Sequence, residues 1–149
     1  MKFYSAILQK NGFDNFRIGG GTKKLKEVED SRIGDCFMAK DSQHDDVEFQ
    51  IMNNKIAIIS SMNDKRASYN GIKKGDSEEK IYEKSNRKYL EKKINPYGDS
   101  KKNYSLIDWN DGNKKMGTRY DIESGRVVGI MVGIHHCLLK NQQGRGQLM

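Results

Sequence analysis

The sequence predicts an α+β fold, in which two related units of a short helix and antiparallel strands form one mostly antiparallel sheet, with the short helices on one side. Three observations predict it. Residues 47 to 51 (VEFQI) alternate apolar and polar side chains, the period of a half-buried strand. Asp-Gly at 111–112 and Ser-Gly at 124–125 favour tight hairpin turns. The third observation is a similarity between the two halves of the chain.

The first half is expected to hold one short helix and one hairpin. Residues 23–30 (KKLKEVED) place Leu25 and Val28 three positions apart, as on one side of a helix. Residues 47–51 and the apolar run 56–62 (IAIISSM) then form two strands joined by an Asn-Asn turn.

The second half is expected to begin with a helix and continue as a meander of strands. Asp76 or Ser77 can cap the helix, and two glutamates follow in its first turn. Residues 87–94 either continue this helix or form a strand. Three strands follow, at 104–109, 116–122 and 127–134. The whole chain should contain at least six strands and two short helices.

An internal repeat relates the two halves. With Phe16 placed over Ile72, Gly19 falls on Gly75 for an offset of 56, and FQIMNNKIAII matches YDIESGRVVGI for an offset of 71. We therefore expect a single domain, 1–149, built of halves at about 12–62 and 70–134, with a frayed tail at 138–149. Each helix should start just after its glycine, Gly19 or Gly75.

The glycine-rich stretch FRIGGGTKKL (16–25) is predicted to be a turn and not a phosphate-binding loop. A loop of the Walker type needs Gly, four residues and then Gly-Lys-Ser/Thr, an order that GGGTKK lacks.

The charge of the chain suggests several classes of partner. With a net charge of +7, the protein could be drawn to nucleic acid, an anionic membrane or an acidic protein. The basic residues are scattered among acids, and no nucleic-acid motif is present, so we expect no specific nucleic acid. No apolar run is long enough to span a membrane. The first residues lack a signal-peptide core, which predicts a cytoplasmic protein, or a periplasmic one if a leader was removed.

Candidate catalytic and metal-binding residues are few. His44 lies in the polar stretch DSQHDD, where it could act as a base but is expected to be a solvated loop histidine. The run His135-His136-Cys137 suggests a metal cluster or a Cys/His dyad, but adjacent strand residues point to opposite faces. We therefore predict a protein that is not an enzyme, with no catalytic residue, no cofactor and no metal.

The stretch Ile72-x-x-Gly75-Asp76-Ser77, with Ile81 and a β-meander after it, resembles a family of small bacterial envelope proteins. The family includes the β-lactamase inhibitor protein and the SmpA/OmlA outer-membrane assembly lipoproteins. The resemblance covers most of residues 12–134. It implies a repeat of short helix and antiparallel strands that binds other proteins without catalysis. Members in the envelope often carry disulfides, so it also implies that Cys36 and Cys137 could pair if the protein is exported. In the cytoplasm both should stay reduced.

These observations favour a non-catalytic protein-binding module, most simply an inhibitor, antitoxin or immunity-type protein that neutralises one protein partner such as a bacterial toxin. An envelope assembly or inhibitor protein is one alternative, and a basic nucleic-acid-binding protein is the second. The candidate partner-binding residues are Trp109, beside the NDGN turn, and Arg119 on the next strand. Trp109 could equally be buried in the sheet. The oligomeric state is left open.

Overall fold

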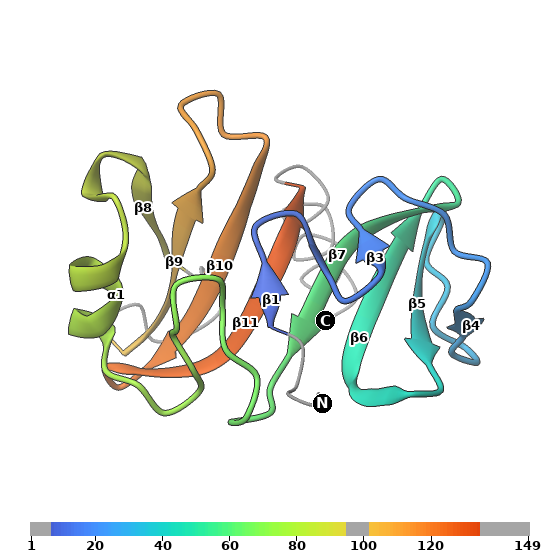
Figure 1. Ribbon diagram of the computed structural model, residues 1–149, viewed down its shortest axis with the longest axis horizontal. Coiled ribbons are helices and arrows are strands. Elements are labelled where there is room, and N and C mark those ends of the chain that lie inside the picture. Colours follow the sequence, from blue (N-terminus) through green and yellow to red (C-terminus); the bar gives the residue numbers. More distant parts are fainter. Residues whose placement is uncertain (1–6, 95–101, 135–149) are drawn as a thin grey trace.

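The computed structural model describes residues 7–94 and 102–134, and it is mostly β, with 53% strand and 8% helix. The expected α+β class is therefore wrong, although the antiparallel pairing was expected. The main sheet is fully antiparallel, and its eight strands lie side by side in the following order: β4 (Lys26–Glu27), β5 (Cys36–Asp41), β6 (His44–Met52), β7 (Lys55–Ser61), β11 (Arg126–Ile134), β10 (Met116–Glu123), β9 (Asn103–Trp109) and β8 (Leu90–Ile94) (Figure 1).

The prediction of a helix at 23–30 is wrong, because this segment contains the edge strand β4 instead. β4 pairs with β5, and just beyond it the Val28 amide donates to the Met38 carbonyl at 2.8 Å. An eight-residue helix is marginal unless a well-packed apolar face supports it. Leu25 is only partly buried and Val28 is 36% exposed, so such a face is lacking. Pairing with β5 satisfies the backbone groups of this segment instead.

The second expected helix is present as α1 (Glu78–Lys84), the α-helix of the described residues. Its Ile81 is fully buried, and Glu78 and Glu79 lie in its first turn, where the helix dipole favours negative charge. A 3-10 turn, η1 (Arg87–Tyr89), follows and leads into β8, so of the segment 87–94 only residues 90–94 form the strand that was one of the two alternatives.

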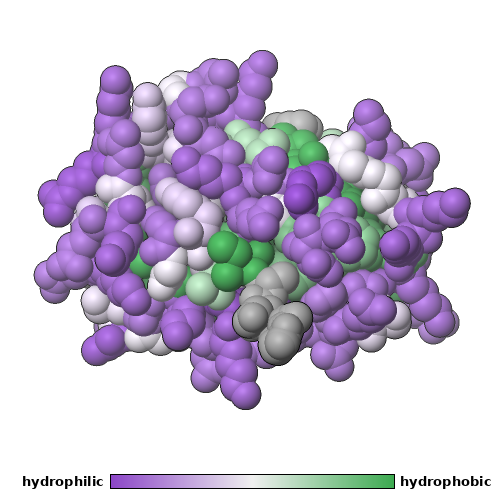
Figure 2. All heavy atoms as spheres, in the orientation of Figure 1, coloured by the Kyte–Doolittle hydropathy of each residue, from purple (hydrophilic) through white to green (hydrophobic). Residues whose placement is uncertain are grey.

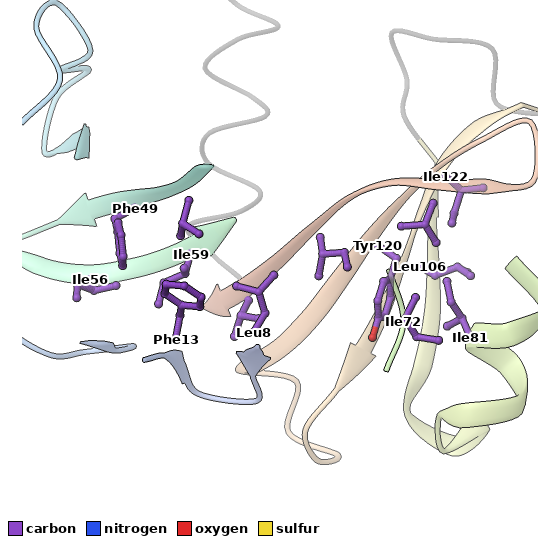
Figure 3. Close-up of a cluster of buried hydrophobic side chains, with 14 of the residues drawn as sticks. Leu8, Phe13, Phe49, Ile56, Ile59, Ile72, Ile81, Leu106, Tyr120 and Ile122 are labelled. Carbon is purple, nitrogen blue, oxygen red and sulfur yellow. The ribbon is translucent and has the colours of Figure 1, made fainter. Parts of the chain in front are cut away.

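One face of the main sheet carries the core of the protein. A small second sheet of three two-residue strands, β1 (Leu8–Gln9), β2 (Gly12–Phe13) and β3 (Phe16–Arg17), covers one end of this face, and α1 covers the other (Figure 1). Figure 3 shows Phe13 packed toward Phe49 on the first half of the sheet, and Ile81 toward Leu106 on the second. Figure 2 shows mostly hydrophilic residues on the outside of this covering layer.

The two matched glycines have the same backbone conformation and make the same backbone hydrogen bond in each half. Gly19 and Gly75 have φ of 87° and 95°, which L side chains rarely adopt. The Gly19 amide donates to the Ile56 carbonyl at 2.7 Å, and the Gly75 amide donates to the Val127 carbonyl at 2.8 Å. Ile56 and Val127 are themselves matched by the repeat. The glycine therefore ties the entering chain to the start of the hairpin's second strand in both halves.

The hairpins of the two halves share both their turn and their irregularity. Asn53 and Asn54 have φ of 53° and 63°, and at the matching positions Ser124 and Gly125 have φ of 50° and 80°. Positive φ at both central residues is the requirement of the two-residue turn that suits a twisted hairpin. A β-bulge follows residue 50 in the first hairpin and residue 121 in the second, again 71 positions apart.

The halves meet where β7 pairs with β11, and this junction has a pseudo-two-fold axis. Ser60 lies opposite Met131, which is its own counterpart in the repeat. On either side, Ile59 pairs with Val132 and Ser61 with Ile130, two pairings that the axis interchanges. The axis passes between Ser60 and Met131, at the centre of the sheet. The limits of the single predicted domain stay a prediction, and the tail at 138–149 lies outside the described residues.

Candidate functional site

The face of the sheet opposite the core holds a shallow hollow, here named the groove, with a volume of about 530 Å³. Seven neighbouring strands, β5 to β8 in sheet order, contribute to it. At about 4.8 Å between strands they extend over roughly 29 Å. Residues with side chains on this face that line the groove include Lys40, Asp46, Glu48, Ser60, Met62, Lys93, Ser105, Arg119, Asp121, Glu123 and Met131.

Strand pairing explains why these side chains share one face. Residues directly opposite each other on paired strands point to the same side of the sheet. A single row of such partners crosses the sheet from β6 to β8 through Glu48, Ser60, Met131, Arg119, Ile107 and Glu91. The pseudo-two-fold axis at Ser60 and Met131 therefore passes through the floor of the groove.

An ion pair braces the second half of the groove. The Arg119 Nε donates to Asp121 Oδ1 at 2.9 Å, and the Ser105 hydroxyl donates to the same oxygen at 2.8 Å. Arg119 is 9% exposed, so its guanidinium is held in place by its neighbours and does not extend into solvent.

A second ion pair lies in the first half of the groove, where Asp46 on β6 is paired with Arg66. The Arg66 guanidinium donates to both carboxylate oxygens of Asp46, at 2.7 and 2.9 Å. These charge-assisted bonds lower the pKa of Asp46 below its ordinary value. Arg66 also lies over the Phe13 ring, so the pair joins the groove end of β6 to the N-terminal strands.

Glu91 connects the edge strand β8 to its neighbours. Its carboxylate accepts hydrogen bonds from Trp109 Nε1 at 2.9 Å and ion pairs with Lys93 and Lys114, both at 3.2 Å. Burial alone would raise the pKa of Glu91, but these three donors outweigh it and lower the pKa to about 2.

Glu91 should make stability depend on pH in the acid range. Because its pKa falls from 4.5 to about 2 on folding, it stabilises the fold above about pH 4.5, and this contribution is lost as the pH falls toward 2. Glu91→Gln should therefore lower the free energy of unfolding at pH 6 and leave it nearly unchanged at pH 2. Urea denaturation at both pH values measures the difference. Glu29→Gln, at an exposed site, is the control, and an equal loss at both pH values for Glu91→Gln would contradict the prediction.

Two other acidic side chains in the groove differ from Asp46, Asp121 and Glu91, which are all in ion pairs. Glu48 on β6 and Glu123 on β10 are exposed, and within the described residues neither makes an ion pair or a side-chain hydrogen bond. Met62, which also lines the groove, is 67% exposed. The groove thus offers uncompensated charge and apolar surface together.

The histidine at position 44 is not in a solvated loop. It begins β6, and its Nδ1 lies 2.7 Å from Asp41 Oδ2, with Nε2 3.6 Å from Asp14 Oδ2. The Phe13 ring packs edge-on against the imidazole at 4.9 Å. These contacts hold the N-terminal strands on the main sheet, which accounts for the position of His44 without chemistry.

A buried polar network on the core face holds another carboxylate with a shifted pKa, that of Asp108. The Tyr69 hydroxyl donates to Asp108 Oδ2 at 2.5 Å, and Tyr120 donates to Ser68 Oγ at 2.9 Å. Burial raises the pKa of Asp108, which is 3% exposed. A carboxylate of this kind is a candidate catalytic group, but Asp108 does not line the groove and is closed off from solvent. The network fixes the segment around Tyr69 on the sheet.

The structure places the residues singled out from the sequence in different surroundings. Trp109 is 2% exposed and belongs to β9, whereas Arg119 lines the groove. Cys36 is buried in β5, close to Ala57 and Ile58. Cys137, like His135 and His136, lies outside the described residues. Within residues 7–94 and 102–134 no group of side chains could hold a metal ion.

Sequence reasoning missed the other groove residues, although part of the signal was present. The apolar side chains at Phe49 and Ile51 assign their strand's other face to Glu48 and its neighbours. The repeat then assigns Arg119 to the same face in the second half. The juxtaposition of Ser60 and Met131 depends on the pairing of β7 with β11, which no local pattern specifies.

The described residues contain no helix that is long and apolar enough to cross a membrane. Comparison of the chain with family models, curated proteins and solved structures finds no match. The resemblance to the β-lactamase inhibitor protein and SmpA/OmlA family therefore stays a prediction.

Proposed function

We propose that the protein is a non-catalytic binding module that neutralises one protein partner, as an inhibitor or immunity-type protein does, and that the groove is its contact surface. The observation that carries the proposal is the extent of the groove. It runs across seven strands and about 29 Å of one open face of the sheet. A long and shallow surface suits a protein partner, whereas small-molecule sites are compact and enclose most of their ligand.

A comparison of the two halves supports the same surface. At matched core positions the residue type is kept, as in Phe49 and Tyr120, or Ile59 and Ile130. At matched groove positions it is not: Glu48 corresponds to Arg119. The fold therefore constrains the core face and leaves the groove free to differ. A surface whose halves differ in charge suits a single asymmetric partner bound in one orientation.

The chemistry of the groove also favours binding over catalysis. Its described lining contains carboxylates, hydroxyls and an arginine, but no histidine or cysteine. Ser105 donates its hydroxyl proton to Asp121, whose other partner is Arg119. A carboxylate in an ion pair is a poor base for activating a serine, because the cation stabilises its charged form.

A capture experiment tests the proposal. The immobilised protein should retain one dominant partner at equal stoichiometry from an extract of the organism that encodes it, through an interface of about 1,600 Å². Ser60→Arg places a long charged side chain at the centre of the groove and should weaken this binding by at least about 100-fold. Ser42→Arg, at an exposed position outside the groove, is the control.

The activity of the captured partner supplies the second measurement. It should fall in proportion to the fraction bound, and it should recover when Ser60→Arg replaces the wild-type protein. Equal capture by Ser60→Arg and by Ser42→Arg would show that the partner binds elsewhere. Full activity of a saturated partner would exclude the inhibitor role.

A further inference from the structure

The groove differs in charge from the rest of the protein. The whole chain carries a net charge of +7. The groove instead has four acidic side chains against three basic ones, for a local balance of −1: Asp46, Glu48, Asp121 and Glu123 against Lys40, Lys93 and Arg119. The basic character of the chain therefore does not describe the surface that we assign to binding.

Ion pairs within the protein account for most of these charges, and of the three basic residues only Lys40 makes no ion pair with a described residue. Asp46 and Asp121 are already paired with arginines, and Lys93 is paired with Glu91. Of the four acids only Glu48 and Glu123 keep their charge uncompensated by any described residue. Complementary charge on a partner steers encounter and fixes orientation, so these two carboxylates specify basic groups opposite them.

The positions of the two carboxylates set a spacing for those basic groups. β6 and β10 are three strand spacings apart, or roughly 14 Å. Arg119 on β10 lies in the same cross-strand row as Glu48. Glu123 lies four residues further along β10, which is a distance of roughly 13 Å along the strand. The diagonal is therefore roughly 19 Å, the length of about six residues of extended chain.

Six is an even number, so residues six apart on an extended strand point to the same side. Between the two carboxylates the partner would pass over the centre of the groove, where Met62 is exposed and Met131 is half-buried. Apolar side chains between the basic ones would meet this surface.

We propose that the groove binds an extended segment of its protein partner that carries two basic side chains six residues apart, one opposite Glu48 and one opposite Glu123, with apolar side chains between them. This inference rests on the proposed function and adds the chemistry of the partner. It reverses the expectation, drawn from net charge alone, of an acidic partner.

Synthetic peptides test the spacing and the charge directly. The probe is the labelled peptide acetyl-SRSVSVSRS-amide, in which both arginines and both valines face one side of an extended chain. Acetyl-SRSVSVRSS-amide puts the arginines on opposite sides, and acetyl-SESVSVSES-amide reverses the charge. Fluorescence anisotropy with the full-length protein in about 50 mM salt should show at least tenfold tighter binding of the first peptide than of either control.

Protein variants then identify the carboxylates. Glu48→Gln combined with Glu123→Gln should weaken binding of the first peptide about tenfold. Glu29→Gln combined with Glu83→Gln removes the same charge from exposed sites outside the groove and should leave the binding unchanged. Equal binding of the three peptides, no binding of any, or equal affinity of the two double variants would each overturn the inference.

The two proposals fail in different ways. If Ser60→Arg abolishes capture of the natural partner while the Glu48→Gln and Glu123→Gln variant captures it normally, the groove is the binding surface and the inferred basic segment is wrong. If Ser60→Arg leaves capture intact, the proposed function fails first.

Discussion

Replacing Trp109 with alanine is expected to lower the free energy of unfolding by about 3 to 5 kcal/mol, as loss of a large buried aromatic side chain usually does. The Trp109 side chain is 2% exposed and lies opposite Gly117 on β10. The indole Cε3 lies only 3.0 Å from the position that a Cβ on Gly117 would take, so the glycine provides the space that the ring fills. Alanine would leave that space empty.

The hydrogen bond from the indole to Glu91 adds a smaller term, which a second variant separates. Trp109→Phe keeps a ring but loses the Nε1 donor, and should cost about 1 to 2 kcal/mol. Trp109 is the single tryptophan, so urea denaturation should be followed by far-UV circular dichroism and not by fluorescence. Unchanged stability of Trp109→Ala with a loss of partner binding would show instead that the side chain serves as an exposed anchor.

The strands could be predicted where the signal is local. The alternation at 47–51, the Asn53-Asn54 turn and the Ser124-Gly125 turn specify hairpins by side-chain period and by backbone dihedral angles, and each forms as expected. The matched glycines Gly19 and Gly75 were also visible in the sequence, because only a residue tolerant of positive φ suits both positions.

The first helix could not be predicted correctly, because its alternative depends on a distant partner. Leu25 and Val28 fit a helical period, but the open edge of β5 offers backbone hydrogen bonds to the same segment. Short patterns are ambiguous between helix and strand, and tertiary pairing decides between them. In the second half α1 forms because Ile81 has a buried site to fill.

The groove could be predicted only in part for a related reason. Alternation assigns Glu48 to the outer face of its own strand, but the groove exists because seven strands are assembled in one order. That order depends on the β7–β11 junction, which joins residues about 70 positions apart. The side chains that we assign to binding are therefore brought together by long-range pairing.

Gly133 is the residue through which this junction can be tested, and Gly133→Ala is expected to lower the free energy of unfolding by about 2 to 3 kcal/mol. Gly133 on β11 lies opposite Ile58 on β7. An added Cβ would lie 2.5 Å from the Ala57 carbonyl oxygen and 2.9 Å from Ile58 Cγ1. The oxygen belongs to the backbone of the neighbouring strand, so the clash can be relieved only by moving the two strands apart.

Gly129 provides the matched control on the same strand. A Cβ there would be no closer than 3.6 Å to its nearest neighbour, Met62 Cγ, which is an ordinary contact. Gly129→Ala should therefore be neutral or slightly stabilising, because alanine reduces the freedom of the unfolded chain. Thermal and urea denaturation of the two variants compare the sites directly. Equal stability of Gly133→Ala and Gly129→Ala would mean that β7 and β11 are not held as closely as the structure shows. The continuous floor of the groove, to which both halves contribute, would then lose its structural basis.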